Sequence, residues 1–189
     1  MKLVETIVRT FITNNLIKQD EYELYCYCFD IVFSKIFFIG MIFSIALLLG
    51  QVSVTVAYYV GFSAIRYTSG GYHADSPEVC FMLSIAVYLG SLGLIHIIPV
   101  ATNPEVLLGM FLLAAVLILR FAPVAHPNKP FSPREKYEYQ KKSRVAIISC
   151  ILAAAILWGA NPLLSWAVTV GCSTAAVSVA VAKKYPKKV

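Results

Sequence analysis

Charged residues are scarce in this sequence. They make up 14% of its 189 residues, against about 25% in an average soluble domain. A soluble domain of this length covers its surface with polar side chains, so a surface this poor in charge faces a medium other than water. The composition therefore excludes an ordinary soluble domain and predicts a protein embedded in lipid.

The sequence also lacks the signatures of several well-known chemistries. Its five cysteines are an odd number without paired spacings, which argues against a disulfide framework. It contains no H-E-x-x-H metal helix, no G-x-S-x-G elbow and no phosphate-binding glycine loop. We therefore expect reduced thiols, no metal, no cofactor, and neither serine-hydrolase nor nucleotide chemistry.

Hydrophobic residues are abundant instead, at 59% of the chain, and they gather in long runs. Several runs approach the ~20 residues that a helix needs to cross a ~30 Å hydrocarbon layer. We predict an all-α, polytopic membrane protein that forms a single domain over 1–189. Because the second run is short, six spans are predicted and five are the alternative. The predicted spans are 31–50, 52–66, 79–98, 104–122, 143–160 and 162–182.

An amphipathic segment precedes these runs. Over residues 3–12, apolar side chains recur at helical spacing with polar ones opposite. Within 1–18 we therefore expect a helix that lies on the membrane surface, with packing on a soluble core as the alternative. The first sixteen residues have no continuous apolar core, so we expect them to be retained rather than removed as a signal peptide.

Basic residues indicate the orientation. The formal net charge is +6, and no Lys or Arg occurs near 50–53, 99–104 or 159–162. The basic residues gather instead in the N-terminal segment, the predicted loop 123–144 and the C-terminal tail. With six spans all three lie on one side, which the positive-inside rule makes cytoplasmic together with both termini. Anionic lipid headgroups account for these charges, so we expect a lipid partner and no nucleic acid.

One predicted cytoplasmic segment, 67–80, carries the residues for chemistry. His73 and Cys80 form the minimal set for a cysteine nucleophile, because an imidazole can take the thiol proton and later return it to a leaving amine. In one straight helix the two side chains would stand ~10 Å apart. Gly70 and Gly71 permit a turn, however, so His73 can fold back from a loop over the following helix start.

The helix start is signalled by the run Asp75-Ser76-Pro77-Glu78. Either Asp75 caps the helix with Glu78 at N3, or Ser76 caps it with Pro77 at N1. Cys80 then lies in the opening turn, where the helix dipole favours a thiolate and free N–H groups can hold an oxyanion. The structural alternative is a cysteine that only fills space and a histidine that is only solvated.

These residues also resemble a known family. Arg66, the run Gly70-Gly71-Tyr72-His73-Ala74 and Cys80 resemble the AgrB family of bacterial membrane cysteine endopeptidases, which process the precursors of cyclic autoinducing peptides. The resemblance covers essentially the whole chain. A later stretch is similar to that family's Pro- and Lys-rich cytoplasmic loop, with Ala122-Pro123, Asn128-Lys129-Pro130, Lys141-Lys142 and Arg144.

The resemblance implies a function. Cys80 would be the nucleophile, and His73 the general base and acid, of a membrane-embedded cysteine endopeptidase. The enzyme would cleave the C-terminal tail from a small AgrD-like precursor peptide through a Cys80 acyl-thioester. It would then support cyclisation of the remaining peptide to a thiolactone or lactone quorum-sensing signal. The implied location is the bacterial plasma membrane.

The resemblance also implies substrate contacts. The family's precursors resemble amphipathic helices followed by acidic tails, which a basic surface would attract. For Arg66 two roles stay open: holding a peptide carboxylate or carbonyl, and capping the second span. For the loop lysines and arginines, the alternative is a topology signal that anchors to lipid. The expected substrate-binding residues are Arg66, Gly70, Gly71, Lys129, Arg134, Lys141 and Lys142.

Two other functions fit a small polytopic protein: a multi-span transporter, and a peptide escort without catalysis. Transporters usually place ionisable groups near the bilayer midplane. Here the predicted spans are nearly free of such groups between their ends, and the candidate residues gather at one face. This distribution favours the enzyme. The oligomeric state is left open, with a homodimer as one candidate.

Overall fold

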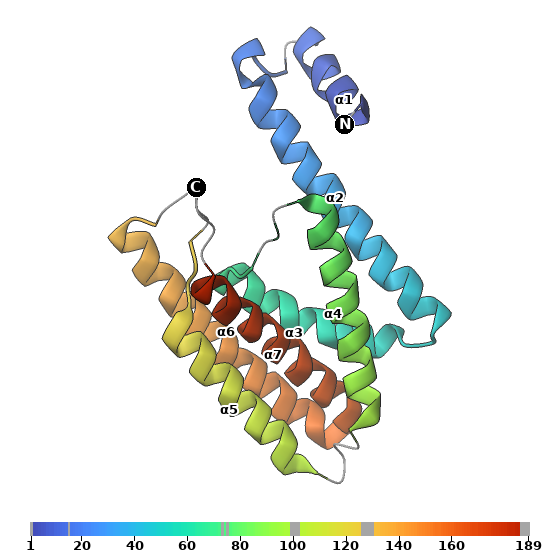
Figure 1. Ribbon diagram of the computed structural model, residues 1–189, viewed down its shortest axis with the longest axis vertical. Helices are drawn as coiled ribbons and strands as arrows, with labels where there is room; N and C mark the ends of the chain where they lie inside the picture. The colour runs from blue at the N-terminus through green and yellow to red at the C-terminus, as the bar shows by residue number, and fades with distance from the viewer. Residues whose placement is uncertain are drawn as a thin grey trace. The chain divides into compact units, whose positions relative to one another are not determined.

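The computed structural model describes residues 2–14, 16–72, 74, 76–98, 103–125 and 131–185. Within these residues every regular element is a helix, which confirms the predicted fold class (Figure 1). The chain forms two units, residues 1–48 and 49–189, and each is described by itself.

Residues 1–48 form a pair of helices. The predicted amphipathic helix is α1 (Lys2–Thr13), and a short 3₁₀ turn, η1 (Gln19–Glu21), leads into α2 (Tyr22–Leu48). Because the first turns of α2 carry Glu23 and Asp30, the apolar run starts later than the helix does. The prediction followed the apolar run and placed the start at residue 31, whereas the helix begins at Tyr22.

The two helices of this unit pack through apolar side chains. Val4 and Val8 of α1 are buried, and the rings of Phe11 and Phe29 meet edge to face at a centroid distance of 5.7 Å. Such a pair adds about 0.5–1.5 kcal/mol to the burial of its area. Part of the apolar face of α1 is therefore covered by α2.

Residues 49–189 contain five helices in their described part. Four of them begin and end within three residues of the predicted spans. The exception begins at Pro133 rather than at residue 143, because Ser132 and Glu135 form a capping box there. The predicted basic loop 123–144 is therefore shorter than expected, and its residues from 133 onward are helical. The five helices are α3 (Val52–Ser69), α4 (Pro77–Ile97), α5 (Pro104–Phe121), α6 (Pro133–Ala160) and α7 (Pro162–Lys184).

Five of the described helices are long and apolar enough to cross a membrane, namely α2, α4, α5, α6 and α7. This number is close to the predicted six, and the difference is α3. Polar residues such as Thr55, Tyr58 and Arg66 interrupt its 18 residues, which are not apolar enough to count as a candidate span. Because α3 lies against α7, these polar groups can contact protein instead of lipid.

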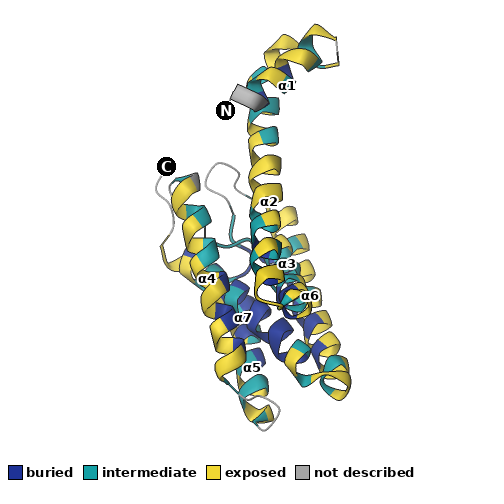
Figure 2. Cartoon of the chain, turned by 90° about the vertical axis from the view of Figure 1, so that its right-hand side faces the viewer, coloured by how far each residue is buried: buried dark blue, intermediate teal, exposed yellow. Residues whose placement is uncertain are grey.

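Helix α7 forms the core of residues 49–189. It packs against α3, α4, α5 and α6, and 67% of its most apolar stretch is buried, against at most 22% for the other candidate spans. Figure 2 shows α7 in dark blue, whereas α4, α5 and α6 turn mostly exposed faces outward. Small and hydroxyl-bearing side chains are frequent on α7, and such residues let helices approach closely inside a membrane.

The central contact joins α3 and α7, which run in the same direction. Gly61 of α3 lies against Val168 and Cys172 of α7, and Arg66, further along α3, reaches Ser178, further along α7. In a six-span order the second and sixth spans cross the membrane in the same direction. The parallel pair fits that order.

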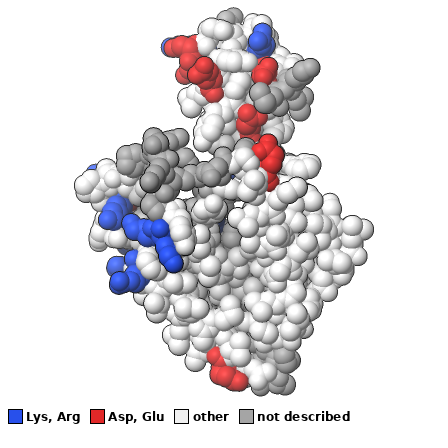
Figure 3. Space-filling model, viewed as in Figure 1, with Lys and Arg blue, Asp and Glu red and all other residues white. Residues whose placement is uncertain are grey.

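Several helix ends meet at one end of this unit. Val124, just after α5, donates its N–H to the Ser69 carbonyl at 2.9 Å, and Ser143 of α6 donates its hydroxyl to the Thr68 carbonyl at 3.0 Å. Figure 3 shows basic side chains gathered there on the visible face, above a surface almost free of charge. We call this the basic end, after Arg120, Arg134, Lys136, Lys141, Lys142, Arg144, Lys183 and Lys184.

Candidate catalytic site

The start of α4 fixes the position of Cys80. Ser76 is the N-cap and Pro77 follows at N1, so the second of the two predicted caps is the one that forms. The Ser76 hydroxyl accepts the Val79 N–H at 3.2 Å, and the Ser76 carbonyl accepts the Cys80 N–H at 3.0 Å. Cys80 therefore lies in the opening turn of α4, as predicted.

The same cap limits what this turn can bind. The N–H groups of Val79 and Cys80 already donate to Ser76, and Pro77 has no N–H to offer. The expected set of free backbone donors for an oxyanion is therefore reduced by the cap. A negative charge at Cys80 still lies near the positive end of the helix dipole.

The segment before α4 begins with a turn that only glycine can make. Gly70 and Gly71 have φ values of 75° and 149°, in the region that side chains strongly disfavour. A Cβ atom on Gly70 would lie 2.6 Å from the Val124 carbonyl oxygen, and one on Gly71 would overlap the Arg66 guanidinium. Both glycines are thus required by the close approach of their neighbours.

Arg66 holds this turn together. Its Nη1 donates to the Gly70 carbonyl at 3.2 Å and to the Ser178 hydroxyl at 3.0 Å, and its Nη2 donates to the Tyr72 carbonyl at 2.6 Å. Two roles were left open for Arg66, and these contacts correspond to the capping role. They reach beyond the end of α3 to the carbonyls of the following turn. The guanidinium donates to carbonyls of the protein itself, so it stabilises the conformation of the turn.

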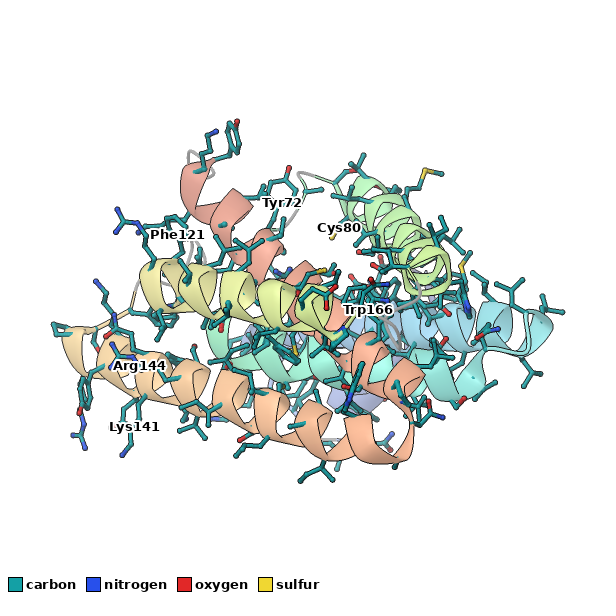
Figure 4. All side chains as sticks on the ribbon, turned by 90° about the horizontal axis from the view of Figure 1, so that it is seen from below. Tyr72, Cys80, Phe121, Lys141, Arg144 and Trp166 are labelled. Atoms are coloured by element: carbon teal, nitrogen blue, oxygen red, sulfur yellow. The ribbon has the colours of Figure 1, made fainter. Side chains whose placement is uncertain are left out.

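Cys80 lies close to this arrangement. Its side chain is half-buried, and a negative charge on its sulfur would interact favourably with the Arg66 guanidinium. Figure 4 shows Tyr72 and Cys80 on the same side of the unit, between the end of α7 and the start of α4. His73 and Asp75 lie outside the described residues, so the His73–Cys80 pair stays a prediction.

The predicted basic contacts lie elsewhere. Arg134, Lys141 and Lys142 are on the first turns of α6, and Lys129 lies outside the described residues. In Figure 4 Lys141 and Arg144 point outward from α6, across the unit from Cys80. These side chains therefore cannot hold the peptide bond that Cys80 would attack, although a longer substrate could reach them.

Sequence reasoning missed the contribution of α7 to the site. The Ser178 hydroxyl accepts the Tyr72 N–H as well as the Arg66 Nη1–H, and the Ser178 carbonyl accepts the Tyr72 N–H too, at 3.1 Å in both cases. More than a hundred residues separate Ser178 from this turn. A serine within an apolar run gives no local signal of such a contact.

Comparison with known proteins adds relatives at modest identity. The chain is 29% identical over 129 residues to a putative AgrB-like protein of Clostridium perfringens, 26% over 128 residues to protein FsrB of Enterococcus faecalis, and 25% over 115 residues to accessory gene regulator protein B of Staphylococcus intermedius. The matches cover 65%, 68% and 61% of this chain, and 57%, 53% and 60% of the relatives. The chain thus spans little more than half the length of these relatives.

No solved structure matches the chain. The model of the family Accessory gene regulator B, however, matches residues 4–179. That range includes most of both units, with the glycine turn, Cys80 and the contact from α7. The resemblance that the motif around Cys80 suggested is confirmed, and the chain belongs to the AgrB family.

Proposed function

We propose that this protein is a membrane-embedded cysteine endopeptidase that removes the C-terminal tail of a small precursor peptide and supports cyclisation of the remainder. One observation carries the proposal: Cys80 is held in the capped opening turn of α4, beside a glycine turn braced by Arg66. Membership of the AgrB family supports it, since three relatives carry accessory gene regulator or FsrB names.

The first step is acyl transfer to the enzyme. His73 takes the proton of the Cys80 thiol, and the sulfur attacks the carbonyl carbon of the peptide bond before the tail. The C–N bond then breaks, and His73 returns the proton to the nitrogen of the departing tail. The products are a free tail with a new amino terminus and a peptide joined to Cys80 as a thioester.

The second step closes the ring. A cysteine or serine within the bound peptide gives its proton to His73 and attacks the thioester carbonyl. The bond to Cys80 breaks, the Cys80 sulfur takes the proton back from His73, and a thiolactone or lactone leaves. Exchange between a thioester and a thiol is nearly neutral in energy, so the intramolecular nucleophile wins by its high effective concentration. Water must be excluded for this step, and a site at the end of an apolar helical unit favours that exclusion.

The basic end supplies a place for the tail. Arg134, Lys141 and Lys142 stand on the exposed first turns of α6, and an acidic tail would be attracted to them while the bond to be cut lies at Cys80. Lys129 belongs to the same proposed set. The positive-inside rule puts this end, and with it both termini, on the cytoplasmic side of a bacterial plasma membrane.

Two rival functions make different predictions. A transporter or a peptide escort would need the basic end but not the Cys80 sulfur. In the described part of residues 49–189, α3, α5 and α7 carry lysine or arginine only in the last turn, and α6 carries them only in its first half. A transport pathway, by contrast, usually has ionisable groups at the midplane. This distribution favours the enzyme over the transporter.

The deciding experiment replaces Cys80. The purified protein is reconstituted in vesicles with a candidate precursor, and the products are followed by mass spectrometry. We expect wild type to give free tail and a Cys80-linked acyl adduct, and Cys80→Ala to bind precursor without cleaving it. The matched control is Cys28→Ala, which removes an exposed thiol from the other unit and should keep full activity. Cleavage by Cys80→Ala would refute the proposal.

A further inference from the structure

Ser178 is the point at which the central helix meets the glycine turn. Its hydroxyl accepts two hydrogen bonds, from Arg66 Nη1 at 3.0 Å and from the Tyr72 N–H at 3.1 Å. Two is the full number of acceptor positions on a hydroxyl oxygen. Its carbonyl accepts the Tyr72 N–H as well, at 3.1 Å. No other described side chain donates to or accepts from both the Arg66 guanidinium and the Tyr72 backbone.

The two partners of Ser178, Arg66 and Tyr72, both belong to the contacts that hold the glycine turn. Arg66 binds the carbonyl of Gly70 at the entry and the carbonyl of Tyr72 at the exit, so the guanidinium spans the turn. Ser178 fixes that guanidinium and the exit residue to α7. Val124 and Ser143, by contrast, bind carbonyls of Thr68 and Ser69 in the last turn of α3, before the glycines.

The exit residue is one peptide bond from His73. Consecutive Cα atoms are ~3.8 Å apart across a trans peptide, so the position of Tyr72 restricts where the next Cα atom can lie. A misplacement of about 1 Å in a reacting group can cost about a hundredfold in rate. The anchor at Tyr72 therefore acts on the residue directly before the proposed base.

We propose that Ser178 is a positioning residue for the peptidase reaction, which holds the glycine turn, through Arg66 and the Tyr72 backbone, so that His73 meets Cys80. This inference rests on the proposed function. It assigns α7, the central helix of the unit, a part in the reaction, and it explains why the turn is tied to a helix so distant in sequence. Ser178 itself touches neither substrate nor the reacting atoms.

The test compares two serines of the same helix. Ser178→Ala removes the hydroxyl that accepts from Arg66 and Tyr72, and keeps the carbonyl that also accepts from Tyr72. Ser165→Ala removes a buried hydroxyl that donates to the Ala154 carbonyl at 2.8 Å, far along α7 from the turn. Single-turnover cleavage and the KM for a synthetic precursor are measured for both variants in vesicles. We expect Ser178→Ala to lower kcat about ten- to a hundredfold with KM nearly unchanged, and Ser165→Ala to leave kcat and KM at wild-type values.

Two further measurements separate positioning from general loss of structure. Hydrogen exchange of a peptide covering 70–76 should speed up in Ser178→Ala and stay unchanged in Ser165→Ala. In a double-mutant cycle with Arg66→Gln, the effect of Ser178→Ala should be smaller than in wild type, because one of the two contacts of the Ser178 hydroxyl is with Arg66. If Ser178→Ala does not accumulate, Ser178→Cys, with a weaker acceptor of similar size, takes its place.

The outcomes are distinct. Unchanged kcat in Ser178→Ala, a loss confined to KM, or full additivity with Arg66→Gln would overturn the role of Ser178 while leaving the peptidase intact. Cleavage by Cys80→Ala would instead overturn the proposed function. A lowered kcat with faster exchange in 70–76, absent from Ser165→Ala, supports the assignment.

Discussion

The contact between α3 and α7 gives the sharpest prediction about packing. Gly171 of α7 lies so close to α3 that an added Cβ atom would come within 3.0 Å of two backbone atoms, the Tyr58 carbonyl oxygen and the Phe62 nitrogen. Cβ atoms essentially never approach other atoms so closely. Because backbone atoms cannot rotate away as a side chain end can, Gly171→Ala must push the two helices apart.

The size of the effect can be worked out from two opposing terms. Overpacking of a well-packed contact costs about 1–3 kcal/mol. Alanine is about 1 kcal/mol more favourable than glycine within a helix, which offsets part of that cost. With two backbone overlaps the cost lies in the upper part of its range, so we expect Gly171→Ala to destabilise the folded protein by about 1–2 kcal/mol.

A matched glycine supplies the control. Gly109 lies within α5, and an added Cβ atom there would have no neighbour within 4 Å. Gly109→Ala should therefore leave stability unchanged or raise it by up to about 1 kcal/mol. Both variants are unfolded by sodium dodecyl sulfate in mixed micelles, with circular dichroism as the signal, and the midpoints are compared with wild type.

The contact at Gly171 also bears on the site. Ser178 is two turns further along α7, so separating the helices lengthens its 3.0 Å contact with Arg66 Nη1, and hydrogen bonds weaken quickly beyond this distance. We expect Gly171→Ala to lose cleavage activity as well as stability. If it unfolds at the wild-type midpoint or above, or if Gly109→Ala is equally destabilised, the reasoning from backbone contact is wrong.

Three further changes test other parts of the structure. Ser76→Ala should cost about 1 kcal/mol of stability by removing the N-cap of α4. It should also slow single-turnover cleavage, because Cys80 is in the same turn. An unchanged cleavage rate would contradict the role of the cap in placing Cys80. Tyr88→Phe removes a buried 2.7 Å contact with Thr55 and should cost about 0.6–1.7 kcal/mol in detergent unfolding, whereas no loss would mean the pair is not formed. Replacing Lys141 and Lys142 together by Gln should raise KM for a precursor with an acidic tail roughly three- to tenfold at low salt, with kcat unchanged. Added salt should remove the difference in KM, because it screens exposed charges. Equal KM values at low salt would argue that these lysines only anchor the protein to lipid.

Local signals predicted much of the fold. Pro77, Pro104 and Pro162 each stand at the first position of a helix that the apolar runs had placed within two residues. The predicted start at residue 143 failed because it followed hydrophobicity alone. Ser132 and Glu135, three residues apart, carried the capping signal that marks the true start of α6.

The candidate site was predicted only in part. The cap at Ser76 and the turn at Gly70 are local features, and a sequence can indicate them. The anchor at Ser178 depends on which face of α7 meets α3, and that is decided by the glycine contacts between the helices. One sequence without related sequences beside it gives no measure of such distant pairing.

The central position of α7 has a consequence for how the protein is made. The ribosome releases α3, α5 and α6 before α7, so the helix that all of them pack against enters the bilayer after they do. Until then α3 can contact α6, but the glycine turn lacks its contact with Ser178. A chain interrupted before α7 would therefore have Cys80 but not the contact between Ser178 and the glycine turn.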